Sequence, residues 1–155
     1  MRLVTGLTAA LALMSPGVRG VVDSAPAIVS APDSPVKLDH ATVLRIDGAP
    51  PVLVYAATNM TDGQLDQFTV MVFVFNAGGT LKARQVAPGR RTLETHETKY
   101  SAMVLDGTHI DPADIIVAGV NQAQRVNSDS WWRAELQPAA EEAAKQHKTA
   151  KQPLG

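Results

Sequence analysis

The sequence predicts an all-β protein, an antiparallel sandwich of about seven strands. From Val36 onward, short apolar or β-branched runs alternate with turn clusters rich in Gly, Asn, Asp and Pro, a spacing typical of a sandwich or barrel. No stretch within residues 36–134 keeps a helical period over about ten residues, which argues against helices between parallel strands. A chain of 155 residues, 45% of them hydrophobic, is enough for one domain with a buried core.

Turn chemistry separates the predicted strands in chain order. The turn segments are DGAPP, NMTDG, NAGG, PGRRTLETHET, DGTHIDPA and RVNSD. NAGG is too short for a parallel crossover, so the strands on either side of it form an antiparallel hairpin. The predicted strands are Lys37–Ile46, Val52–Thr58, Phe68–Phe75, Leu81–Val86, Lys99–Leu105, Asp114–Gln122 and Ser130–Ala134.

The two ends of the chain have different compositions from the strand-rich part. Residues 1–20 predict a secretory signal peptide, because Arg2 precedes an apolar run of 12 residues and Ser15-Pro16-Gly17 breaks it. The run is too short for stable membrane insertion, which takes about 20 apolar residues, so the predicted localisation is secreted or periplasmic. Residues 21–35 predict a linker, residues 36–134 the β-sandwich domain, and residues 135–155 a flexible tail without a large apolar stripe.

Bulk composition excludes several function classes. The formal charge of −1 gives no general attraction to nucleic acid. The absence of cysteine excludes disulfides, thiol catalysis and cysteine-ligated zinc.

The segment FTVMVFVF at residues 68–75 is apolar on both of its faces. Phe68, Val70, Val72 and Val74 form one face, which is predicted to point into the core. The other face carries Thr69, Met71, Phe73 and Phe75, and DIIVAGV at 114–120 repeats the double-faced pattern. If these strands are neighbours, their second faces merge into a patch too large to leave in water on a monomer. Met71, Phe73 and Phe75 are therefore predicted to bind a protein partner or a second copy.

Trp131 and Trp132 are adjacent, so in a strand their rings point to opposite faces. One ring then fills the core. The outer ring either binds a sugar or a protein surface, or lies over Met71 and Phe73. Both tryptophans are counted among the predicted binding residues.

One polar segment, DGTHIDPAD, gathers Asp106, His109, Asp111 and Asp114 within nine residues. These groups are potential ligands for calcium or a transition metal, but the order lacks an EF-hand pattern and fits a polar turn better. The histidines lack metal-site spacing, and no serine lies in a G-x-S-x-G frame. No catalytic residue, no metal site and no cofactor is predicted.

The order from Val52 to Asn121 resembles the immunoglobulin-like β-sandwich domains of exported bacterial proteins, of the FxLyD type. The residues that carry the resemblance are the Asn59-Met60-Thr61-Asp62 strand end, Phe75-Asn76, the Gly78-Gly79 hairpin and the Leu93 to Glu97-Thr98 segment. Such domains usually have Pro-Gly before the Glu-Thr pair, whereas Thr95-His96 stands there in this chain. The resemblance implies an accessory or interaction module without catalysis.

The predicted function is an exported, non-catalytic interaction or assembly module. One alternative is a small carbohydrate- or ligand-binding module that uses the outer tryptophan with Asn121, Gln122 and Gln124. A metal-dependent enzyme is a second alternative, and it rests only on DGTHIDPAD.

Overall fold

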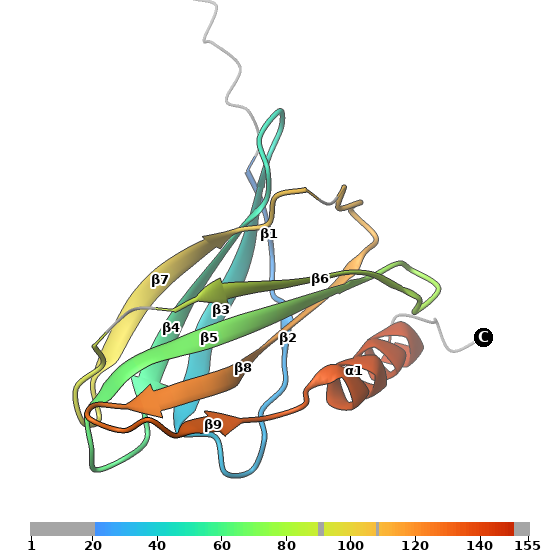
Figure 1. Cartoon of the computed structure of the whole chain (residues 1–155). Coiled ribbons are helices and arrows are strands. Elements are labelled where there is room, and N and C mark those ends of the chain that lie inside the picture. The colour runs from blue at the N-terminus through green and yellow to red at the C-terminus, as the bar shows by residue number, and fades with distance from the viewer. Residues whose placement is uncertain (1–20, 90–91, 108, 151–155) are drawn as a thin grey trace, which may run out of the picture.

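The computed structural model describes residues 21–89, 92–107 and 109–150. It shows two β-sheets packed face to face, with one helix against the outside of the second sheet (Figure 1). The predicted signal peptide, residues 1–20, lies outside the described residues. No helix within the described ranges is long and apolar enough to cross a membrane.

All seven predicted strands are present, with ends within about three residues of the expected positions. Sheet A has the order β1-β3-β4-β7, and every pairing in it is antiparallel. Sheet B has the order β2-β8-β5-β6, and β9 also pairs with β8. The strands are β1 (Val21–Ser24), β2 (Ala27–Ile28), β3 (Val36–Ile46), β4 (Val52–Asn59), β5 (Leu65–Phe75), β6 (Leu81–Pro88), β7 (Thr98–Val104), β8 (Ile115–Arg125) and β9 (Trp131–Arg133).

The inner faces of the two sheets form one core. Phe68, Val70 and Val72 point into it, as predicted, and all three are fully buried. They meet Leu53 and Tyr55 from sheet A. This alternation of buried and outward positions places the second face of β5 on the outside of the sandwich.

Two turns explain local features of the sequence. In the NAGG hairpin, Gly79 has a positive φ of 87° and the Asn76 Oδ1 accepts a hydrogen bond from the Thr80 amide at 2.9 Å. His96 has a φ of 58°, a left-handed conformation that costs least for glycine. The His96 Nε2 lies 3.1 Å from the Asp62 Oδ1.

The sequence suggested that residues 21–35 are a linker, but in the structure parts of this segment form strands. Val21–Ser24 pair with β3 in sheet A, and Ala27–Ile28 pair in parallel with β8 in sheet B. The Val29 amide then donates to the Ala118 carbonyl at 3.0 Å. The segment therefore crosses from one sheet to the other. Each contact uses only two to four residues, too few to leave a periodic pattern in the sequence.

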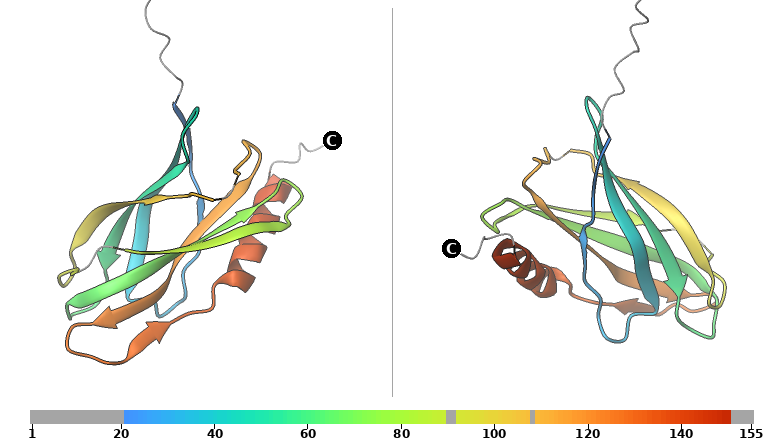
Figure 2. Two further views of the ribbon diagram at one scale, coloured as in Figure 1. Left: turned by 45° about the horizontal axis from the view of Figure 1, so that its top comes forward. Right: turned by 180° about the vertical axis from the view of Figure 1, so that it is seen from behind.

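Residues 137–150 of the predicted flexible tail instead form a helix, α1 (Gln137–Ala150), which lies against the outer face of sheet B (Figure 2). The rest of the predicted tail, residues 151–155, lies outside the described residues. Leu136, Ala140 and Ala144 are almost fully buried. Their spacing of four residues puts them on one side of the helix, because α-helices have 3.6 residues per turn. Alanine lets the helix axis approach the sheet closely, so a face without large apolar residues still docks.

Gly119 provides the space for this docking. A Cβ atom at Gly119 would lie 2.5 Å from the Val29 carbonyl oxygen and 2.8 Å from a methyl group of Leu136. Glycine is therefore required where the 21–35 segment and the start of the α1 region cross β8.

Candidate functional site

The predicted interaction face of β5 is part of a second, intramolecular core. Phe73 and Phe75 are fully buried, and their rings stack with centroids 6.4 Å apart. β5 and β8 are neighbours, as expected, with Phe73 opposite Val117. The cover comes from the chain itself, and the residues packed on this face are Val29, Leu136, Ala140 and Ala144.

The assignment of Phe73 and Phe75 to a partner-binding surface is therefore corrected. Met71 is half-buried at the border of the same cluster. The sequence argument was right that this face needs a cover, since burying such side chains contributes roughly 1.5–3 kcal/mol each. It missed the cover because α1 meets the aromatic rings with alanine side chains.

Trp131 and Trp132 do point to opposite faces of sheet B. Trp132 lies opposite Ala123, packs against the inner core and donates from its Nε1 to the Asp33 Oδ2 at 3.1 Å. Trp131 lies opposite Gln124 on the outer side. Both side chains are half-buried. Neither belongs to the cluster that covers Phe73.

The outer face of sheet A carries apolar side chains that no other described element covers. The strand register aligns Leu44 with Val52 and Val104, and Ala56 with Tyr100. Tyr100 is 63% exposed and Val104 is 56% exposed. We call this surface the sheet A face; its residues are Leu44, Ile46, Val52, Val54, Tyr100 and Val104.

Among the described residues, the charged side chains in register with the sheet A face are Asp23, Lys37 and Asp39. Asp23 is in register with Leu44 at one end. Lys37 is in register with Thr58 at the other end, where its Nζ lies 3.2 Å from the Asp39 Oδ1. Between Asp23 and Lys37, Asp39 lies in register with Ala56, and the other positions carry Leu, Val, Ala, Thr and Tyr.

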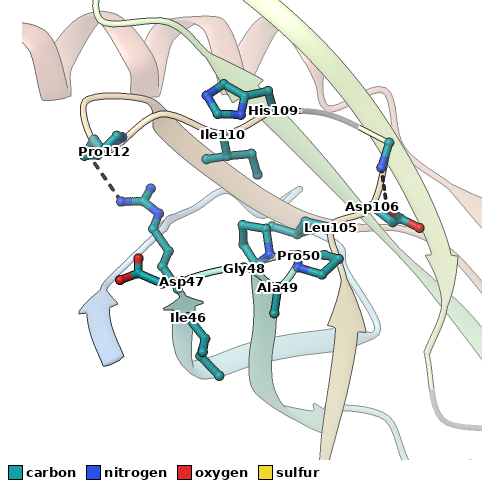
Figure 3. A pocket seen from close by; sticks show the side chains of 13 residues that line it. Ile46, Asp47, Gly48, Ala49, Pro50, Leu105, Asp106, His109, Ile110 and Pro112 are labelled. Carbon is teal, nitrogen blue, oxygen red and sulfur yellow. Dashed lines mark hydrogen bonds between the residues drawn. The ribbon is translucent and has the colours of Figure 1, made fainter. Parts of the chain in front are cut away.

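A cavity of about 610 Å³ lies between the β3–β4 hairpin and the loop that leads into β8 (Figure 3). Leu105, Ile110 and three prolines give it an apolar wall. Arg45 forms another wall, where its Nη1 lies 3.4 Å from the Pro112 carbonyl and its Nε is buried with no hydrogen-bond partner among the described residues. The loop on one side includes residue 108, which lies outside the described ranges.

The aspartates of the DGTHIDPAD segment form ion pairs with Lys82 of β6. Lys82 Nζ lies 3.0 Å from the Asp111 Oδ2 and 2.5 Å from the Asp114 Oδ2. Asp114 also accepts from the Asp111 amide at 2.7 Å, which closes the turn. The hydrogen bonds that Lys82 donates to Asp114 and Asp111 raise the pKa of Lys82, and the bond that Asp111 accepts from Lys82 lowers the pKa of Asp111. The ammonium group thus occupies the place between these carboxylates, and the described residues contain no cluster of three metal-ligating side chains.

Tyr55 is a titratable group inside the sandwich. Its burial raises the pKa of the phenol, and a hydrogen bond with Ser101 opposes this shift. The Tyr55 phenol therefore stays neutral at physiological pH, as expected for a structural tyrosine.

A second cavity, of about 400 Å³, opens beside Trp132, and we call it the Trp132 pocket. Its floor is formed by Leu65 and Ala123, which are buried. The polar and aromatic side chains at its walls are Asp33, Ser34, Thr61, Arg125, Ser128, Ser130 and Trp132.

The amides predicted to accompany the tryptophan do not line this pocket. Asn121 is buried and accepts from the Thr69 hydroxyl at 2.7 Å, while Gln124 donates to the Ser128 carbonyl at 2.6 Å. The sequence argument missed Asp33, because it placed residues 21–35 in a linker. A polar Asp-Ser pair between Pro32 and Pro35 was the only signal for it.

Comparison of the chain with models of protein families, with curated proteins and with solved structures yields no match.

Proposed function

We propose that this protein is an exported, non-catalytic interaction module that associates with a second copy of itself through the sheet A face. One observation carries the proposal. The aromatic part of the outer face of sheet B, around Phe73 and Phe75, is covered by α1 and Val29, whereas the outer face of sheet A carries exposed Tyr100 and Val104. Contiguous exposed apolar side chains on a soluble domain are typical of interaction surfaces, and tyrosine is a frequent anchor in them.

The charges at the ends of this face favour a second copy as the partner. Lys37 lies toward one end and Asp23 toward the other, and Asp39 lies beside Lys37, with its Oδ1 3.2 Å from the Lys37 Nζ. A two-fold axis across the strands would bring Lys37 of each copy close to Asp23 of the other. The same surface is then complementary to itself, as a two-fold interface requires.

Pairing through the faces is favoured over pairing through the edge of β7. Lys99 points inward from this edge strand, and its Nζ donates to the Thr92 carbonyl at 2.9 Å and lies 3.2 Å from Glu97. An inward-pointing charge on an edge strand opposes the addition of a further strand. On the sheet A face, in contrast, Asp39 is the one charged side chain between Asp23 and Lys37 among the described residues, and Lys37 forms an ion pair with it.

The size of the face indicates weak association. Four strands about 4.8 Å apart and about seven residues long cover roughly 450 Å². A standard interface buries about 800 Å² on each partner, so a dimer formed here would be transient, at the low end of specific contacts.

Export is supported by the sequence alone. The basic start, the apolar run and the Ser15-Pro16-Gly17 break of residues 1–20 have the layout of a signal peptide. The proposal places the mature domain in the periplasm or outside the cell.

We expect Tyr100→Ser and Val104→Ser to weaken self-association at least tenfold, since each removes an exposed apolar side chain from the centre or the end of the face. The melting temperature should change little, because exposed positions rarely contribute more than about 0.5 kcal/mol. The measurement is sedimentation equilibrium over a concentration series, together with thermal unfolding.

Val86→Ser is the matched control. Val86 is 52% exposed, close to the value for Val104, but it lies on β6 in sheet B. Association that falls equally in the Val86 and Val104 variants, or a wild-type chain that stays monomeric at the highest concentration, would contradict the proposal.

A further inference from the structure

We infer that the Trp132 pocket is a binding site for a neutral saccharide. The site is separate from the sheet A face and shares no residue with it. Its volume of about 400 Å³ falls in the range of ligand sites, about 300–1,000 Å³. A sugar unit or a disaccharide is of suitable size for such a cavity.

The walls of the pocket come from separate parts of the chain that are held together by hydrogen bonds. The Met60 amide donates to the Pro35 carbonyl at 2.8 Å, which joins the end of β4 to the 32–35 loop. The Trp132 Nε1 joins the same loop through Asp33. Pro32 and Pro35 restrict the loop backbone. The cavity is thus preformed, which lowers the entropic cost of binding.

The polar groups at the walls suit hydroxyl groups, which both donate and accept. The Arg125 side chain is exposed and makes no hydrogen bond or ion pair with the described residues, so its guanidinium remains a donor for the ligand. Asp33 uses its Oδ2 for Trp132, and its Oδ1 has no partner in the described ranges. Ser128 and Ser130 lie with their hydroxyl oxygens 2.9 Å apart and add further donors and acceptors.

The balance of charge and aromatic surface separates a saccharide from other small ligands. Asp33 opposes an anion that Arg125 alone would attract, and Arg125 opposes a cation in the same way. The hydroxyl and charged groups disfavour a purely apolar ligand, since its binding would leave them desolvated. A sugar ring combines apolar C–H surface, which packs on an indole ring, with hydroxyl groups at its rim.

The test titrates the full chain with glucose, mannose, galactose, N-acetylglucosamine, maltose and cellobiose, followed by calorimetry and tryptophan fluorescence. At least one sugar is expected to bind saturably and to change the fluorescence. Arg125→Gln should weaken binding at least tenfold, as expected for the loss of hydrogen bonds from a charged donor. Trp132→Phe should abolish the fluorescence change.

Two matched variants serve as controls. Arg133→Gln removes an exposed arginine on β9 that does not line the pocket. Trp131→Phe replaces the indole ring on the opposite side of the same strand. Both should bind as the wild type does. The inference is overturned if no sugar binds at about 20 mM, well above millimolar dissociation constants. It is also overturned if Arg125→Gln binds as tightly as Arg133→Gln, or if Trp132→Phe keeps the fluorescence change.

Discussion

Replacing Phe73 with alanine is expected to lower the free energy of unfolding by about 3–5 kcal/mol, the usual cost of removing a buried phenylalanine ring. Phe73, on β5, is fully buried between sheet B and α1, and its ring stacks on that of Phe75. The loss removes apolar contacts and leaves a cavity that the rigid sheet cannot close. Equilibrium denaturation in urea or guanidinium measures the change.

The same variant should leave self-association unchanged, because Phe73 lies in the intramolecular core and not on the sheet A face. Val86→Ala is the control for the stability measurement, and it should cost no more than about 0.5 kcal/mol because Val86 is exposed. A variant at Phe73 that keeps its stability but loses association would instead restore the β5 face as an external binding surface.

Introducing glutamate at Ala140 should lower the free energy of unfolding by about 2–4 kcal/mol, while glutamate at the adjacent Ala139 should be nearly neutral. Ala140 is fully buried against sheet B, whereas Ala139 is exposed. A carboxylate at Ala140 either stays buried without a partner or forces α1 off the sheet, which exposes Phe73 and Phe75 to water.

Thermal or chemical unfolding of the two variants measures this difference, and binding of a hydrophobic dye reports the exposed rings. Because both variants place the same residue in the same helix turn, helix propensity and net charge are matched. Equal stability of the two variants would mean that α1 does not dock.

The sequence predicts the sandwich well because its strands carry local signals. FTVMVFVF followed by NAGG defines both a strand and a hairpin, and β5 and β6 follow at these positions. The second apolar face of β5 was also visible in the sequence. What covers it was not, because α1 packs with Ala140 and Ala144, and alanine contributes little to an amphipathic pattern.

The candidate surfaces were harder to predict for a different reason. Tyr100 and Val104 alternate with inward residues in β7, and Val52 and Val54 do so in β4, so the sheet A face follows from strands that the sequence did predict. Which of two apolar faces stays exposed depends on where the ends of the chain dock. Asp33 and Trp132 are 99 residues apart, and only the fold brings them to one pocket.

Amide hydrogen exchange along residues 137–150 of the native chain tests most directly whether α1 is the permanent cover of sheet B. If the helix is docked, its central amides around Ala144 should exchange much more slowly than those of an unstructured peptide, because the opening must expose the aromatic face of β5. Exchange at the rate of an unstructured chain throughout this segment would contradict the account, since Phe73 and Phe75 would then lack their cover.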